Sequence, residues 1–427
     1  MGRFTVYDES VDQQINQQLQ RIVNVIVDRL GDNVESIILG GGFGRGEGSV
    51  KWVGDAVVPL KDFDFLIVTK KSLPPEVENS VEESVYSALG IQNSKKRIFR
   101  FSDFVVDLNF STPSRLGEVL FPDVAAFEFK VASYLLYGRD VRGQVRCELR
   151  DIPLTSGWRL LFEKMTGLIG HFPGEYLLDG KMESRRQELL VYECEKTYIE
   201  IATALTILMG CYAPSFSTRD SLFRRHFAER LPELSSLMPE LPASVAAATA
   251  FKMRPDFTSL PDPFDLWLNV RDDLLTVSRF YLAKLTGTDI RDFVASNVVR
   301  PLSMCYFHPI SSSLTRRFAL GNHLVLERFT DSALQLYLNV KYVSHSYSEK
   351  GRLPFRILMS PFTCVNLKLQ TIAPRVLLSI DKNGEIDKRY FESAVHSMSE
   401  IVPGADLRSF DMLRKAYLET YKLLQLH

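Results

Sequence analysis

Apolar residues recur at helical spacing between positions 11 and 30, so an amphipathic helix is predicted there. A short β-branched run at 34–39 predicts a strand, which leads into a cluster of glycines that ends at Gly48. Polar and apolar residues alternate at 62–68 and predict a second strand with one polar face. The intervening segment, 51–61, has neither period and is expected to be less regular.

A helix at 75–89 and two paired strands at 97–101 and 104–110 complete an α/β pattern over roughly residues 1–115. Beyond Asp123 the apolar spacing becomes mainly helical. Helices are predicted at 125–137, 158–169, 185–209, 218–229, 264–287, 325–342, 386–400 and 406–425. β-Branched residues at 353–382 indicate strands, and the prolines at 232–263 indicate a linker or a helix-poor boundary.

These patterns predict an α/β N-terminal domain, with a small mixed sheet flanked by helices, followed by a mainly α-helical C-terminal region. The chain has 427 residues and a formal net charge of −1, which disfavours long nucleic acid as a partner. No membrane span is expected, because the apolar stretch 199–212 is short and contains Glu200. A polar N-terminus and five scattered cysteines without a CxxC pair favour a cytoplasmic protein with reduced thiols.

The glycine cluster Gly40–Gly46 follows directly on a predicted strand. Glycines allow a backbone to approach a ligand closely, and successive N–H groups in such a turn form a concavity for anions, phosphate above all. The cluster matches neither the GxxxxGK[ST] phosphate loop nor a strict GxGxxG. A tight turn without a ligand is the alternative.

Asp62 and Asp64 lie two residues apart on a predicted strand, so their carboxylates point to the same face. Two such carboxylates repel each other, and a cation is the usual reason to hold them together. Oxygen ligands without His or Cys favour Mg²⁺ or Mn²⁺. Asp107 lies between apolar neighbours on a later predicted strand. It would complete a three-carboxylate site if that strand lies beside the strand that carries Asp62 and Asp64. A solvated acidic strand, or Asp107 paired with Arg100, is the alternative.

This order of strand, glycine turn, Asp-x-Asp strand and later Asp resembles the polymerase-β-like nucleotidyltransferase superfamily, in its branch that acts on antibiotics and other small substrates. Gly41-Gly42 match the Gly-[Gly/Ser] element of that superfamily. Three aspartates match its metal-binding and catalytic carboxylates: Asp62, Asp64 and Asp107. The resemblance implies a catalytic domain over 1–115 that transfers a nucleoside monophosphate from a triphosphate with Mg²⁺ or Mn²⁺, releasing pyrophosphate.

Arg45-Gly46-Glu47 resembles the Arg-Gly-Glu that often follows the turn in small-molecule members of the superfamily. Arg45 is expected either to contact a nucleotide phosphate or to pair with Glu47. The chain departs from the pattern in two ways: the gap between Gly42 and Asp62 is long, and Phe43 replaces a common polar residue. Neither departure removes a predicted ligand.

The stretch Tyr192-Glu193-Cys194-Glu195-Lys196, followed by Gly210-Cys211-Tyr212 and Ser215-Phe216-Ser217, is similar to the helical substrate domain of small-substrate nucleotidyltransferases, in which a lysine and a polar turn reach the triphosphate. Lys196 is therefore a candidate phosphate contact, and Tyr212 and Ser217 are further nucleotide-binding candidates. The alternatives are a solvated lysine and a core tyrosine. The resemblance implies a helical nucleotide- and substrate-binding domain at 116–230. The apolar spacing alone predicts a mainly helical domain without an assigned role at 231–427.

Three functions agree with these features. The first is nucleotidyl transfer to the hydroxyl or phosphate of a small or sugar-containing acceptor. The second keeps the chemistry but modifies a protein or tRNA, or makes a signalling oligonucleotide. The third is a scaffold that senses nucleotide without turnover. The sequence indicates neither the acceptor, nor the base, nor the oligomeric state.

Overall fold

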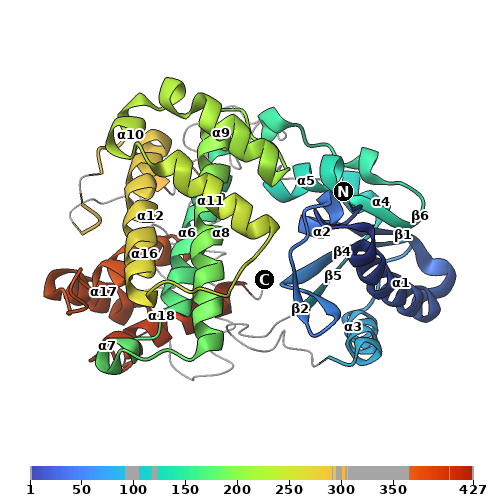
Figure 1. Cartoon of the computed structure of the whole chain (residues 1–427), viewed down its shortest axis with the longest axis horizontal. Helices are drawn as coiled ribbons and strands as arrows, with labels where there is room; N and C mark the ends of the chain where they lie inside the picture. The colour runs from blue at the N-terminus through green and yellow to red at the C-terminus, as the bar shows by residue number, and fades with distance from the viewer. Residues whose placement is uncertain are drawn as a thin grey trace, which may run out of the picture. The chain divides into compact units, whose positions relative to one another are not determined.

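The structure is a computed structural model that describes residues 2–91, 105–117, 123–290, 292–294, 301–302, 305, 365–402 and 404–425 (Figure 1). The chain forms two compact units, each from two stretches of sequence. Unit 1 comprises Met1–Gly157 and Tyr198–Ser259, and unit 2 comprises Trp158–Thr197 and Leu260–His427. These limits do not coincide with the sequence-based boundaries at 115 and 230, because the chain passes from unit 2 into unit 1 within one helix, α8 (Ser184–Leu208).

A four-stranded mixed sheet in the order β5-β4-β1-β6 lies at the centre of unit 1. Its strands are β1 (Val34–Leu39), β4 (Asp62–Thr69), β5 (Val105–Ser111) and β6 (Tyr134–Gly138). β1 pairs antiparallel with β4 and β6, whereas β4 and β5 are parallel. A parallel pair needs a crossover, and α3 (Pro75–Leu89) forms part of it.

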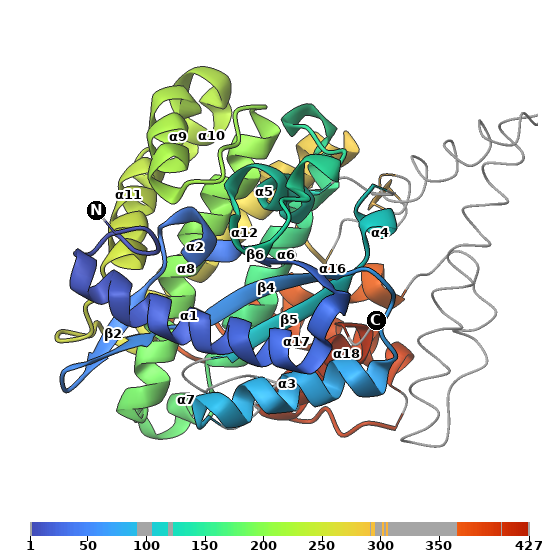
Figure 2. The same ribbon diagram turned by 90° about the vertical axis from the view of Figure 1, so that its right-hand side faces the viewer.

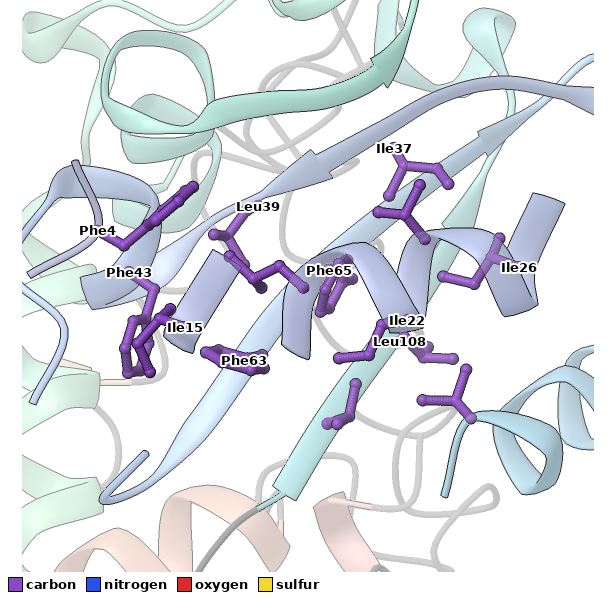
Figure 3. Close-up of a cluster of buried hydrophobic side chains, with 14 of the residues drawn as sticks. Phe4, Ile15, Ile22, Ile26, Ile37, Leu39, Phe43, Phe63, Phe65 and Leu108 are labelled. Atoms are coloured by element: carbon purple, nitrogen blue, oxygen red, sulfur yellow. The ribbon is translucent and has the colours of Figure 1, made fainter. Parts of the chain in front are cut away.

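One face of the sheet packs on α1 (Glu9–Leu30) and α3, which lie side by side (Figure 2). α1 begins because the Asp8 carboxylate accepts hydrogen bonds from the N–H groups of its first turn. The alternation in β4 turns Phe63, Phe65 and Ile67 toward this helical layer, where they join a buried apolar cluster that includes Ile15 of α1 (Figure 3). This core fixes the register of β4 and so decides which residues occupy its other face.

The opposite face of β4 carries Leu66 and Val68, which pack with Ile38 against residues of α5 (Val124–Ala132) and α4 (Pro113–Gly117). Asp62 and Asp64 belong to this same face by the alternation of the strand. Short 3-10 turns complete the α/β part of the unit: Gly31–Asn33, Arg142–Gln144 and Leu149–Asp151.

The structure corrects three predictions in this part of the chain. Residues 51–61, expected to be irregular, contain a hairpin of β2 (Val50–Val53) and β3 (Ala56–Pro59). The helix predicted at 125–137 ends at Ala132, and the edge strand β6 follows, because its apolar residues cover both faces of the sheet. The glycine cluster, expected to be a turn, contains a short helix, α2 (Gly41–Arg45); the segment Gly40–Gly46 is called the glycine turn below.

Unit 1 also contains the end of α8 and three further helices: α9 (Phe216–Arg230), α10 (Pro232–Leu237) and α11 (Leu241–Met253). The predicted helix-poor boundary is therefore wrong for residues 232–253. Proline occupies the first turn of both α10 and α11, where its missing N–H costs no hydrogen bond, so these prolines begin helices rather than interrupt them.

The described part of unit 2 is mainly helical, with an isolated antiparallel bridge between Ile380 and Ile386. Its helices are α6 (Leu154–His171, from Trp158), α7 (Tyr176–Asp179), the first part of α8, α12 (Pro263–Thr286), α16 (Val365–Leu378), α17 (Lys388–Ile401) and α18 (Phe410–Gln425). The strand prediction for 353–382 is wrong where α16 forms, and the predicted elements at 97–101 and 325–342 lie outside the described residues. Over the ranges described, no helix combines the length and apolarity that a membrane span requires.

Candidate active site

Three aspartates, Asp62, Asp64 and Asp107, lie close together on one face of the sheet, on strands β4 and β5. The register of the parallel pair places Asp64 directly beside Asp107, and Asp62 beside Val105. Side chains at paired positions share a face, so the expected neighbouring strand is present and brings the three side chains together. Each of the three offers a carboxylate oxygen within 4.8 Å of the others, and each residue is half-buried.

The chemistry of this donor set fits a hard divalent cation. All the donors are carboxylate oxygens, and three negative charges at such distances repel one another unless a positive charge lies between them. Across the residues that the structure describes, this is the one close group of three or more His, Cys, Asp or Glu side chains that could hold a metal ion. The three aspartates could thus hold Mg²⁺ or Mn²⁺.

The glycine turn supports this site by leaving room for one of the carboxylates. The N–H of Gly40 donates to the backbone carbonyl of Asp64 at 2.8 Å, so the turn is fastened to β4. Gly41 has φ +59°, and a Cβ placed on it would lie 1.9 Å from Oδ2 of Asp64. Glycine is therefore required here by both the backbone conformation and the neighbouring carboxylate. The phosphate role of Gly41 and Gly42 stays a prediction.

Arg45 ends α2 with its guanidinium buried among carboxylates. Nη1 donates to Oε2 of Glu128 at 2.7 Å, and Nε lies 3.8 Å from Oε2 of Glu47. The guanidinium also stacks 4.6 Å from the ring centre of Phe216. Burial opposes the charge, but Glu128, with Tyr212 and Glu47, raises the pKa of Arg45 overall. The pairing with Glu47 is present, and a contact with phosphate stays a prediction.

Tyr212 and Ser217 join the same group of side chains. Tyr212 is 3% exposed, and its hydroxyl donates to Glu128. Burial, with the help of Glu128, raises the pKa of Tyr212 despite two nearby arginines, so the hydroxyl remains a donor. Ser217 is exposed, yet its hydroxyl donates to Oε1 of Glu47 at 3.0 Å. Their nucleotide-binding roles stay predictions.

Arg219 completes this arrangement, which we call the Arg45 network: Arg45, Glu47, Glu128, Tyr212 and Arg219. Arg219 is 3% exposed, donates to the Tyr212 hydroxyl at 3.1 Å and lies 3.4 Å from Glu128. No pattern in the sequence pointed to Glu128 or Arg219, and Glu47 was predicted only as a partner of Arg45. The Arg-Gly-Glu segment was the one available signal, because the other partners come from distant parts of the chain.

Lys196 lies in unit 2, whereas the three aspartates lie in unit 1. It is half-buried on α8, three residues from Glu193. Burial raises the pKa of Glu193, but Lys164, His171 and Lys196 together lower it to about 2. The ammonium of Lys196 thus contributes to the electrostatics of a buried carboxylate, and its contact with phosphate stays a prediction.

The sequence matches no protein-family model, and no curated protein is detectably similar to it. Among solved structures, the chain is similar to spectinomycin adenyltransferase AAD(9) from Enterococcus faecialis, crystallised with ATP and spectinomycin. The alignment has a TM-score of 0.36 and 12% sequence identity, and it covers 61% of this chain and 98% of the other. Similarity at this level establishes neither a shared fold nor a shared activity.

Proposed function

We propose that the protein is a metal-dependent nucleotidyltransferase. The observation that carries the proposal is the meeting of Asp62, Asp64 and Asp107 on two parallel strands, with carboxylate oxygens within 4.8 Å of one another. The glycine turn that fits around Asp64 adds a second element of the expected site. In the reaction, an acceptor oxygen forms a bond to the α-phosphorus of a nucleoside triphosphate, the bond to the β-phosphate breaks, and pyrophosphate leaves.

The three aspartates would have two roles, metal binding and proton removal. Asp62, Asp64 and Asp107 would together hold the metal, and Asp107 would also assist removal of the proton from the acceptor hydroxyl. When bound, Mg²⁺ or Mn²⁺ neutralises phosphate charge and makes the acceptor hydroxyl more acidic. Gly41 leaves the space that the Asp64 carboxylate occupies, because a Cβ at that position would lie 1.9 Å from Oδ2.

A small or sugar-containing molecule is the proposed acceptor. The formal net charge of −1 gives no overall basic surface for a long polyanion, whose binding depends on many phosphate contacts. Modification of a protein or tRNA, or synthesis of a signalling oligonucleotide, would use the same three carboxylates and differ only in the labelled product.

The test is label transfer from each α-labelled nucleoside triphosphate in the presence of Mg²⁺ or Mn²⁺, with a cell extract as the source of acceptors. Wild-type protein is compared with Asp62→Asn, Asp64→Asn and Asp107→Asn. Asp55→Asn is the matched control, because Asp55 is exposed at the tip of the β2–β3 hairpin.

We expect label transfer and pyrophosphate release with wild type and Asp55→Asn, and neither with the three site variants. The labelled species then identifies the class of acceptor. Nucleotide binding without turnover under any of these conditions would favour the sensing scaffold instead. Wild-type protein that binds no nucleotide would contradict the proposal.

A further inference from the structure

The carboxylate of Glu47 holds the first turn of α9. Oε2 accepts a hydrogen bond from the N–H of Phe216 at 2.8 Å, while Oε1 accepts from the hydroxyls of Ser215 at 2.8 Å and Ser217 at 3.0 Å. The N–H of Ser217 lies 3.4 Å from the same Oε1. N–H groups in the first turn of a helix have no partner within the helix and favour a negative charge. Glu47 therefore caps a helix that begins 169 residues later in the chain.

The backbone of Glu47 is tied at the same time to the glycine turn. Its N–H donates to the carbonyl of Gly42 at 2.8 Å. Gly41, the residue before Gly42, lies so close to Asp64 that a Cβ on it would fall 1.9 Å from Oδ2. A continuous series of contacts thus leads from the first turn of α9, through Glu47 and the turn, to a carboxylate of the candidate metal site.

Burial makes this connection rigid and sensitive to charge. Glu47 is 6% exposed and Phe216 is 9% exposed, so water does not readily replace their hydrogen bond. Arg45 lies against both residues, 3.8 Å from the Glu47 carboxylate and 4.6 Å from the centre of the Phe216 ring. Glutamine at position 47 would remove the negative charge and replace one of the two acceptor oxygens with an NH₂ group, so the hydrogen bonds to the first turn of α9 would become weaker.

We propose that Glu47 is a positioning residue of the transferase site: without touching substrate, it holds the glycine turn so that the Asp64 carboxylate stays aimed at the other two. This inference rests on the proposed function. It gives the Arg-Gly-Glu segment a role different from the phosphate contact considered for Arg45. The segment ties the metal site to the helical part of its own unit.

The experiment compares full-length wild type with Glu47→Gln, Ser217→Ala, Asp64→Asn and Glu229→Gln. Glu229 is the matched control, because it lies on α9 with a side chain that is 79% exposed. Hydrogen exchange is followed by mass spectrometry, Mn²⁺ binding by electron paramagnetic resonance, and turnover by label transfer. Ser217→Ala removes one donor to Glu47 and keeps the inference testable if Glu47→Gln does not fold.

In Glu47→Gln we expect faster exchange at 41–48 and 215–219 together, with exchange in β1 and β4 unchanged. Mn²⁺ affinity of the folded protein should fall by about tenfold, as is typical when the support of a metal ligand is removed. The kcat should fall by a similar factor, while KM for the nucleotide changes less. Ser217→Ala should show the same changes at smaller size, and Glu229→Gln none of them.

Two outcomes separate this inference from the proposed function. If Asp64→Asn loses Mn²⁺ and turnover while Glu47→Gln and Ser217→Ala behave like Glu229→Gln, the inference is overturned and the transferase stands. Faster exchange throughout unit 1 with unchanged Mn²⁺ affinity also overturns it, because Glu47 would then act only on stability. Wild-type protein that neither binds Mn²⁺ nor transfers label overturns the proposed function and this inference with it.

Discussion

Unit 1 contains two charged groups of opposite design. Asp62, Asp64 and Asp107 carry charges of one sign and are half-buried. The Arg45 network sets two arginines against two glutamates, and its arginines are deeply buried, with side-chain exposures of 7% for Arg45 and 3% for Arg219. Opposite charges in one group attract each other, whereas like charges held close together repel and favour the binding of a cation. The three aspartates are therefore arranged as a ligand site, whereas the Arg45 network holds together distant segments of the chain.

The largest expected effect is on activity and comes from the like-charged group. Asp62→Asn, Asp64→Asn and Asp107→Asn should each lower label transfer by ~1000-fold or more, which corresponds to several kcal/mol of transition-state stabilisation. The same changes relieve repulsion, so the melting temperature without metal should stay level or rise. A large fall in melting temperature without metal would show that the aspartates serve the fold instead.

The balanced group should respond in the opposite way. Glu128→Gln leaves two buried arginines facing one carboxylate, and the free energy of unfolding should fall by about 3 kcal/mol. Urea denaturation followed by circular dichroism measures this change. Glu229→Gln, on an exposed side chain, should stay within ~0.5 kcal/mol of wild type. A Glu128→Gln protein as stable as this control would remove the basis of the comparison.

Gly41→Ala should lower both activity and stability, because Gly41 has a positive φ and lies against the Asp64 carboxylate. The positive φ costs about 1–2 kcal/mol, and the added methyl group displaces Oδ2 of Asp64, so activity should fall by ~100-fold. Gly54→Ala separates these two causes. Gly54 has φ +61° with nothing within 4 Å of an added Cβ, so it should lose stability but not activity. Equal activity in the two variants would contradict the role given to Gly41.

A pH dependence extends the comparison to unit 2. Glu193, beside Lys164 at 2.8 Å, is a buried carboxylate of the balanced kind, and its pKa falls to about 2. Burial alone raises the pKa of Glu195 to about 7, from an ordinary value of 4.5. The folded state then binds the extra proton, so stability is full below about pH 4.5 and falls as the pH rises toward 7.

Glu195→Gln should abolish this loss, which we expect to be on the order of 2 kcal/mol in wild type. Thermal unfolding at pH 5 and pH 8 measures it, with Glu240→Gln, at an exposed position of unit 1, as the control. Wild type and Glu195→Gln with the same pH profile would show that the carboxyl is more hydrated than its burial indicates.

The sequence predicted the part of the site that depends on local pattern. Alternation in β4 fixed the common face of Asp62 and Asp64, and the apolar neighbours of Asp107 marked it as an aspartate on a strand. The prediction of a three-carboxylate site required β5 to lie beside β4, and the structure confirms this pairing. Helix α1 and strand β1 followed from equally strong periods.

The remainder depends on contacts between distant residues, which one sequence does not display. Glycine has a low helix propensity, so α2 was not predicted; it forms where Gly44 lies against the carbonyl of Leu39 and a side chain would not fit. Apart from their contact with each other, Arg45 has a partner 83 residues away and Glu47 has partners 168–170 residues away. Local patterns therefore predicted the aspartates but could not reveal the buried network.

The division of unit 1 into two stretches of sequence has a consequence for how the protein is made. Residues 158–197 of unit 2 leave the ribosome before Tyr198–Ser259 complete unit 1. Until then, α9 is not available to bond the carboxylate of Glu47 or to cover Arg45, and the α/β part of unit 1 is without its second stretch of sequence. During synthesis, the α/β part of unit 1 therefore remains incomplete while the first residues of unit 2 are made. We expect a chain truncated after residue 157 to be retained by chaperones rather than to fold as a free catalytic domain.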